Sequence, residues 1–270
     1  MRIKFIIPSK DNSDYINYEL YHILRQELNS LGEVDIVDDS PDIVHVFGTW
    51  SNKCFKTMYK YRKIGVPVVF TSLMGMIPLV NKNGMPITNS NTHIAIKKMA
   101  KKNIIVHVCG SKETLLIKQV TSKANVVQIL NPSFTSLMTA RQMSKCFFEL
   151  YTSEIKRNEK EIIEVISRQL VSLNIEDPII FDICLRLIYI KKRFIMHNIP
   201  IEYLRETSKK LYVSNYDERL LRNIIITLKM SKTASAIMSL LKDVTNLTEG
   251  FMPIEYTDGK YVEQMKKYIL

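Results

Sequence analysis

The stretch Asp42-Ile-Val-His-Val-Phe-Gly48 decides the fold class. It is a short, continuous apolar run with β-branched residues, which is the pattern of a strand buried on both faces of a parallel sheet. A second stretch of this kind, Pro67-Val-Val-Phe-Thr71, follows a helical segment that begins at Ser51 and closes at Gly65. A strand, a helix and a further strand in this order predict a right-handed crossover between parallel strands.

The same alternation continues on both sides of these two strands. Further strands are predicted at residues 2–7, 34–37, 104–108 and 126–130, with helices at 15–31, 51–63, 90–101 and 111–120. We therefore predict an α/β fold for residues 1–135, a Rossmann-like, doubly wound parallel sheet. Beyond Asn131-Pro132 the strand pattern stops, and residues 136–270 are predicted to form an all-helical domain. In that domain Asp177-Pro178 starts one helix, and Ser214 or Asn215 caps another.

Composition and targeting signals indicate an ordinary folded protein, with 46% hydrophobic and 24% charged residues. No window reaches the run of about 18 uncharged apolar residues that a membrane span requires, and the N-terminus lacks the apolar core of a signal peptide. The four cysteines are scattered in apolar contexts, as is typical of free thiols in a reducing compartment. We expect a cytoplasmic protein, either free or bound peripherally at the inner face of a membrane.

The loop after the first strand, residues 8–14, contains no glycine. It therefore matches neither a dinucleotide fingerprint nor a P-loop, both of which need glycines for close backbone approach to phosphates. No histidines or cysteines stand at metal-ligand spacing. Accordingly, neither a cofactor nor a metal site is predicted.

A ligand site is nevertheless expected where the loops after the strands converge, at the carboxyl edge of the sheet and facing the helical domain. Trp50 and Gly75 should lie at this same edge. Trp50 is the only tryptophan, and it either packs against the helical domain or contacts a sugar ring. The helix starting at Ser111 offers free backbone N–H groups, which suit an anion. The residues predicted to line this strand-end crevice are Ser9, Lys10, His45, Gly48, Trp50, Ser72, Gly75 and Ser111.

Two runs of basic residues account for much of the net charge of +11. The lysines predicted to form a membrane- or anion-binding surface are Lys53, Lys56, Lys60, Lys63, Lys97, Lys98, Lys101 and Lys102. Such a surface attracts acidic lipid headgroups, phosphates or nucleic acid, and Phe55 and Tyr59 add the aromatic residues of interfacial segments. The alternative is a solvated face of two helices without a binding role.

Four stretches of the first half carry a resemblance to a known family. They are Asp42-Ile-Val-His-Val-Phe-Gly-Thr-Trp50, Lys63-Ile-Gly-Val-Pro-Val-Val-Phe-Thr-Ser72, Val108-Cys-Gly-Ser-Lys-Glu113 and Val127-Gln-Ile-Leu-Asn-Pro132. In this order they resemble strand ends and loops of the N-terminal, acceptor-side domain of GT-B glycosyltransferases of family 4. His45 matches the inward histidine of the family's third-strand motif.

Departures from the family pattern bear on catalysis. In the family, a histidine next to a glycine follows the fourth strand, whereas this loop reads Thr71-Ser-Leu-Met-Gly75 and keeps only the glycine. Phe47 replaces the second histidine of the third-strand motif. The C-terminal donor-binding domain is not recognisable, and the echo of the family's Glu-Gly-Phe…Pro…Glu motif at Thr248–Glu255 is two residues short, so it is interpreted as coincidence.

Three functions follow from these observations. The resemblance implies the acceptor-side half of a GT-B enzyme that acts with a donor-binding protein partner in glycan or polysaccharide synthesis, its lysines facing a membrane or a lipid-linked acceptor. The alternative is a non-catalytic, degenerate scaffold or protein-interaction module, because one Rossmann-like fold supports many functions. Nucleic-acid binding rests on charge alone and no known motif supports it, so nucleic acid is not the expected partner.

Overall fold

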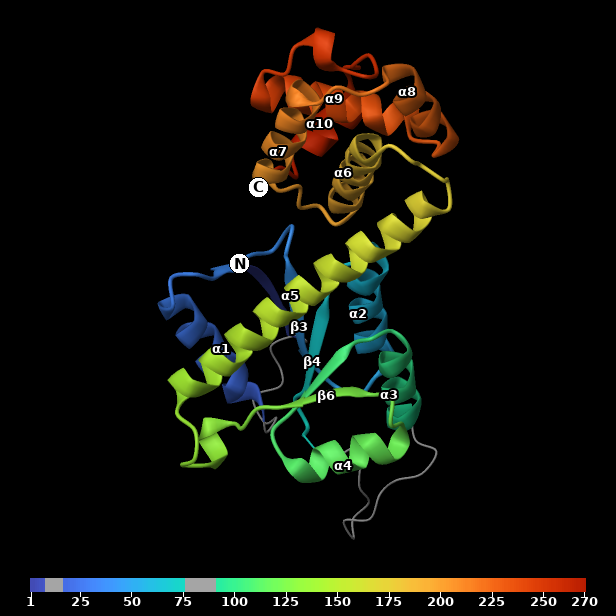
Figure 1. Cartoon of the computed structure of the whole chain (residues 1–270). Coiled ribbons are helices and arrows are strands. Elements are labelled where there is room, and N and C mark those ends of the chain that lie inside the picture. Colours follow the sequence, from blue (N-terminus) through green and yellow to red (C-terminus); the bar gives the residue numbers. More distant parts are fainter. Residues whose placement is uncertain (8–16, 76–90) are drawn as a thin grey trace. The chain divides into compact units, whose positions relative to one another are not determined.

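The computed structural model describes residues 1–7, 17–75 and 91–270 and confirms the α/β class (Figure 1). Two compact units divide the chain, unit 1 at Met1–Asn158 and unit 2 at Glu159–Leu270. Unit 1 holds the parallel sheet, whereas unit 2 is built from helices. Among the described residues, no helix combines the length and apolar character needed to cross a bilayer.

Six parallel strands form one sheet, as the sequence predicts. Its order is β2-β1-β3-β4-β5-β6, so the direction in which strands are added reverses between β1 and β3. In doubly wound sheets this reversal is the point where neighbouring loops part and leave a crevice. The strands are β1 (Arg2–Ile6), β2 (Asp35–Ile36), β3 (Ile43–Gly48), β4 (Val68–Ser72), β5 (Ile105–Val108) and β6 (Asn125–Gln128).

Helices cover both faces of this sheet (Figure 1). One face packs against α1 (Tyr18–Ser30) and the first part of α5 (Ala140–Val171), which share a core with the inward residues of β1, β3, β4 and β5. The other face packs against α2 (Asn52–Ile64), α3 (Asn91–Lys101) and α4 (Ser111–Val120). Every residue of β3 and of β4 is buried, which explains why their sequences are continuous apolar runs.

The ends of α2 follow from its sequence. The Ser51 hydroxyl accepts a hydrogen bond from the Cys54 backbone N–H at 3.3 Å, as expected of a helix cap. Gly65 ends the helix with a φ of 102°, a left-handed conformation that glycine adopts without steric cost. Ser51 and Gly65 therefore mark the two ends of α2, as the sequence predicts.

Unit 2 contains the second part of α5 and five further helices around one core. As predicted, Asp177 caps α6, accepting hydrogen bonds from the backbone N–H groups of the first turn. The predicted caps of α8, Ser214 and Asn215, are wrong: Asp217 takes this role, because its carboxylate accepts two first-turn N–H groups. The helices are α6 (Pro178–Ile195), α7 (Ile201–Val213), α8 (Glu218–Thr227), α9 (Ser231–Thr245) and α10 (Lys260–Lys266).

The two units divide within α5, whereas the sequence predicts a boundary at residue 135. Met143, Phe147 and Tyr151 recur every four residues along α5, and all three are fully buried in the core that also contains Leu24 of α1. This spacing forms an apolar stripe along one side of a helix. The first part of α5 therefore belongs to the sheet unit.

Candidate functional site

Five of the eight predicted strand-end residues, Gly48, Trp50, Ser72, Gly75 and Ser111, lie at the carboxyl edge of the sheet. Gly48 and Ser72 are partners in the register of β3 and β4, and the Leu73 backbone N–H donates to the Gly48 carbonyl at 2.8 Å. Trp50 and Gly75 directly follow these two strand ends. The prediction that they share one edge is confirmed. Ser9 and Lys10 lie outside the described residues.

Asn17, just before α1, ties several of the loops at this edge together. Its side-chain N–H donates to the Ser72 carbonyl at 2.7 Å, and its oxygen accepts from the Asn131 amide at 3.3 Å. Its side chain is buried, so each of these hydrogen bonds replaces one that water no longer supplies. We call the polar group around it the Asn17 cluster, formed by Asn17, Ser72, Gly75, Cys109, Glu113 and Asn131.

Glu113 is the acidic member of the Asn17 cluster. One carboxylate oxygen accepts a hydrogen bond from the Cys109 backbone N–H at 2.8 Å. Burial raises the pKa of Glu113, although hydrogen bonds from the backbone N–H groups of Cys109 and Gly110 act in the opposite direction. A carboxyl group with a raised pKa, at a sheet edge where ligands bind, is a candidate for proton transfer.

The range 111–120 predicted for this helix matches α4, but Ser111, which the sequence also favours as its cap, does not occupy that position. Ser111 is exposed and is the first residue of the helix, and Gly110 occupies the cap position. Glu113, the third helical residue, closes the helix start by reaching back to the N–H groups before it, which is one half of a capping box. Ser111 is thus a surface residue of this edge.

Gly75 keeps open the space beside Glu113. Its φ is +53°, and a β-carbon at this position would stand 3.6 Å from a Glu113 carboxylate oxygen and 3.9 Å from the Asn17 amide nitrogen. Any other residue would be strained by the positive φ and would place a side chain against the carboxyl group.

A pocket of about 330 Å³ lies where the sheet order reverses, at the ends of β1 and β3. Ile6, Val46 and Phe47 contribute apolar walls, while Thr49 and Lys53 contribute polar groups. We call it the switch-point pocket, and it is lined by Ile6, Ile7, Val46, Phe47, Thr49, Ser51, Lys53, Cys54 and Thr57. Its position is the one that the doubly wound topology favours for a ligand.

Gly48 has a packing role at this edge. A β-carbon on Gly48 would lie 2.7 Å from the Cys54 sulfur and 3.5 Å from the Phe70 ring. Glycine at this position therefore allows α2 to approach β3 closely. This packing accounts for a glycine at position 48, and no ligand contact is needed to explain it.

Trp50 is buried, with 6% of its surface exposed. Its ring meets Phe70 edge to face, with centroids 4.9 Å apart. It also lines a second pocket, of about 380 Å³, between the starts of α2 and α3. We call this the Trp50 pocket, and its lining residues are Trp50, Ser51, Asn52, Phe55, Asn91, Ile94, Ala95 and Lys98.

His45 is placed differently from the predicted crevice, because it lies inside the sheet with no exposed surface. Its Nδ1 faces the Tyr151 hydroxyl, and its Nε2 lies 2.7 Å from the Thr71 hydroxyl oxygen. The Thr71 oxygen is 2.9 Å from His107 Nδ1, and His107 Nε2 is 3.0 Å from the Ile129 carbonyl oxygen. These five residues form a buried line across β3, β4 and β5, which we call the His45 chain.

One arrangement of protons satisfies the whole His45 chain. The Ile129 carbonyl can only accept, so His107 Nε2 carries the proton, and its Nδ1 accepts from the Thr71 hydroxyl. The Thr71 oxygen then accepts from His45 Nε2, and His45 Nδ1 accepts from the Tyr151 hydroxyl. Both histidines are neutral, since burial lowers the pKa of His45 well below its usual value and that of His107 to about 4.

The eight predicted lysines lie on or just after α2 and α3, which pack side by side. Seven are exposed, and Lys102 is half-buried. Lys98 Nζ lies 5.6 Å from the centre of the Phe55 ring, and Lys102 Nζ lies 4.7 Å from that of Tyr59. Within the described part of the chain, none of the eight is paired with a carboxylate. We call this surface the lysine face.

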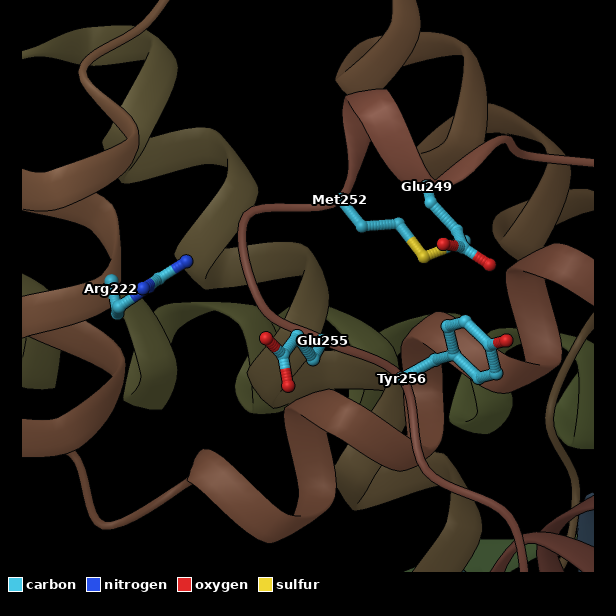
Figure 2. Close-up of a pocket in the computed structure, with 5 residues that line it drawn as sticks. All are labelled: Arg222, Glu249, Met252, Glu255 and Tyr256. Atoms are coloured by element: carbon cyan, nitrogen blue, oxygen red, sulfur yellow. The ribbon is translucent and has the colours of Figure 1, made fainter.

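Unit 2 has a pocket of its own, of about 450 Å³, lined by Arg222, Glu249, Met252, Glu255 and Tyr256 (Figure 2). Both glutamates of the 248–255 stretch are among them. Glu249 is paired with Lys242, whose ammonium lies 3.4 Å from its carboxylate and 3.7 Å from the centre of the Tyr256 ring. Arg222 and the paired Lys242 equal the two glutamates in charge, so the charges at this pocket largely offset one another.

Two features were missed by sequence reasoning. The residues of the Asn17 cluster are spread from position 17 to 131, and no local pattern joins them. The second missed feature can be counted directly in the sequence. Residues 43–112 contain eleven lysines and arginines and no aspartate or glutamate, so this segment alone carries a charge of +11, the same as the net charge of the whole chain. In the described residues no group of histidine, cysteine, aspartate or glutamate is arranged to hold a metal ion.

No protein-family model matches the chain, and neither does any curated protein or solved structure. The resemblance to family 4 glycosyltransferases therefore stays a prediction from sequence.

Proposed function

We propose that unit 1 is the acceptor-binding half of a GT-B-type glycosyltransferase, acting with a donor-binding protein partner in glycan or polysaccharide synthesis. The observation that carries the proposal is the position of Glu113 beside Gly75 at the carboxyl edge of the sheet. The four stretches that resemble the family end at Trp50, Ser72, Glu113 and Pro132. Ser72 is the last residue of β4, and the other three ends come shortly after β3, β5 and β6 at this edge.

Glu113 is the residue that we propose for proton transfer. Glycosyl transfer to a hydroxyl group requires that group to lose a proton, and a carboxylate whose pKa is raised is a stronger base for this step. The loop 71–75 lacks the histidine that the family carries there, and its Leu73 is fully buried. Glu113 faces the same loop from the start of α4, where it would replace that function.

The lysine face supports a lipid-linked acceptor. Its cations lie over Phe55 and Tyr59, a combination of charge and aromatic surface that suits the headgroup region of an anionic membrane. A protein bound there would meet an acceptor whose lipid remains in the bilayer.

The proposal is tested by measuring binding of the full chain to two kinds of ligand by calorimetry. We expect binding of a polyprenyl-diphosphate-linked monosaccharide, and no binding of uridine or guanosine diphosphate sugars tighter than about 10 μM, equivalent to roughly 7 kcal/mol. Tight binding of a nucleotide sugar would place a donor site in this chain and contradict the division of labour. Absence of any acceptor binding would refute the proposal.

One observation favours a non-catalytic scaffold as the second candidate. His45, the match to the family's inward histidine, is fully buried, and both of its ring nitrogens are engaged in the His45 chain. The two candidates differ in what Glu113→Gln does once the donor-binding partner is present. An enzyme half loses glycosyl transfer and keeps the partner, whereas a scaffold shows no transfer to lose. Glu149→Gln, which changes an exposed carboxylate of unit 1, is the matched control.

A further inference from the structure

The helices on one face of the sheet come from a part of the chain that is nearly free of acidic residues. Residues 43–148, which include α2, α3 and α4, contain fifteen lysines and arginines and a single carboxylate, that of Glu113. Glu113 is buried in the Asn17 cluster. On the opposite face of the sheet, α1 carries Glu19 and Glu27 beside one arginine. The outer surface of α2, α3 and α4, which we call the α2–α4 layer, therefore receives basic groups and no exposed carboxylate from these three helices.

Each helix of the α2–α4 layer also exposes a large apolar side chain. Tyr59 on α2, Ile94 on α3 and Leu115 on α4 are 37%, 51% and 63% exposed. The three helices lie side by side on one face of the sheet, because α3 packs against both α2 and α4 (Figure 1). A single exposed apolar residue is ordinary, whereas one on each of three adjacent helices gives the layer several points of apolar contact.

Lysines flank each of these apolar side chains. They stand three or four positions away, so they lie on the same side of the helix as the apolar residue. All of them are exposed. Apolar side chains among lysines are typical of helices at a membrane surface, where the apolar groups enter the acyl boundary and the ammonium groups reach the headgroups. The flanking pairs are Lys56 and Lys63 for Tyr59, Lys97 and Lys98 for Ile94, and Lys112 and Lys118 for Leu115.

The kind of basic residue favours a lipid surface over a nucleic acid. Nine of the ten basic residues within α2, α3 and α4 are lysines. The one arginine, Arg62, donates from Nε and Nη1 to the backbone carbonyls of Lys102 and Val66, at 3.2 and 3.5 Å. Arginine provides the planar fork that binds phosphates and bases in pairs, whereas lysine acts as a point charge. A nucleic acid would also leave Ile94 and Leu115 without an apolar partner.

We propose that the α2–α4 layer binds an anionic lipid bilayer, with Tyr59, Ile94 and Leu115 inserted at the level of the headgroups. The lysines attract the negative surface, and each one within a Debye length of it strengthens binding. The three apolar side chains bind the acyl boundary below. An uncharged bilayer offers the second contribution alone.

The same layer connects the bilayer to the proposed site through α4. Glu113 and Leu115 are two positions apart, about 200° around a helix. Accordingly, Glu113 is buried in the Asn17 cluster while Leu115 is exposed on the other side of α4. The inference rests on the proposed function in naming a membrane as the place of the acceptor, and it adds which helices and side chains hold unit 1 on the bilayer.

The first test is co-sedimentation of the full chain with vesicles that carry no glycolipid. We expect binding at least tenfold stronger to phosphatidylcholine vesicles containing phosphatidylglycerol than to phosphatidylcholine alone. Raising the salt from about 0.1 M to about 1 M, which shortens the Debye length from about 10 Å to about 3 Å, should release the protein. Equal binding to both kinds of vesicle, or to neither, would overturn the proposal. Tighter binding to duplex DNA than to the anionic vesicles, at the same phosphate concentration, would also overturn it.

Two pairs of variants test whether this particular surface is used. Leu115→Gln should weaken binding to anionic vesicles about fivefold, whereas Leu137→Gln, at a leucine that is 81% exposed outside these helices, should change it less than twofold. Lys97→Gln should also weaken binding about fivefold, whereas Lys145→Gln, at an exposed lysine of α5 on the opposite face of the sheet, should change it less than twofold. Equal effects within either pair would refute the surface.

Insertion is measured with a second tryptophan. Leu115→Trp and Leu137→Trp are each bound to anionic vesicles whose acyl chains carry bromine, a quencher, and the emission of the wild type is subtracted. We expect quenching of the added tryptophan at position 115 and not at position 137; equal quenching would overturn the insertion. Vesicle binding without acceptor binding would refute the proposed function and support this inference, and acceptor binding without vesicle binding would do the reverse.

Discussion

Unit 1 should lose stability in mild acid because of the His45 chain. His45 and His107 are buried in their neutral forms, and burial lowers the pKa of both. In the unfolded chain a histidine takes up a proton near pH 6.5. As the pH falls below this value, protons bind the unfolded state first, so the free energy of unfolding decreases.

The magnitude follows from the two pKa values of His107, about 4 in the folded protein against 6.5 for an unperturbed histidine side chain. At about 1.4 kcal/mol per pH unit, His107 alone lowers the free energy of unfolding by about 3 kcal/mol between these limits. His45 acts with the same sign, so the slope approaches about 2.7 kcal/mol per pH unit where both contribute. Glu113 acts oppositely, because its raised pKa favours the folded state as the pH falls.

The assay is urea unfolding between pH 7.5 and pH 5, followed by the emission of Trp50. Since this tryptophan lies in unit 1, its signal reports that unit and not the helical one. His107→Gln should lower stability at pH 7.5 and reduce the slope by about 1.4 kcal/mol per pH unit, the share of one histidine. The matched control is His22→Gln, which removes an exposed histidine of unit 1. A wild-type stability that is flat over this range, or an unchanged slope in His107→Gln, would refute the reasoning.

Three substitutions test the packing at the sheet edge and in the core. Gly48→Ala should destabilise unit 1 by about 1–3 kcal/mol through its clash with Cys54, and adding Cys54→Ala should restore most of the loss in chemical unfolding. Trp50→Ala should cost roughly 3 kcal/mol or more, read by circular dichroism, because the ring is buried; retained stability would favour a ligand role alone. Tyr151→Phe leaves His45 Nδ1 without its donor and should cost about 1–3 kcal/mol; an unchanged urea midpoint would mean that this hydrogen bond contributes nothing.

The sheet could be predicted because its signals are local. The stretch 43–48 is mostly apolar because β3 is buried on both faces. Gly65 ends α2 because glycine adopts the positive φ required there without steric cost. Local signals also explain why the sequence placed the cap of α8 two or three residues too early. Ser214, Asn215 and Asp217 are all good caps, and the choice among them depends on where the helix can first pack.

The candidate site could be predicted only in part. The edge and the loops that form it follow from topology, so Trp50 and Gly75 were placed correctly. The contacts of His45 could not be foreseen, because its partner Tyr151 lies 106 positions away on a helix that looked like part of the other domain. Glu113 was read as part of a helix start, and its burial depends on Gly75 and Asn17 from distant loops.

The helix α5 also constrains how this protein can have been assembled from smaller pieces. A genetic break near residue 135, where the alternating pattern ends, would separate the sheet from Phe147 and Tyr151 and leave His45 facing a void. A break near the middle of α5 would instead cut a continuous helix. An exchange of the helical half therefore either removes one side of the sheet core or joins two pieces within a helix. Recombination that keeps residues 140–158 with the sheet is the one least disruptive to its core.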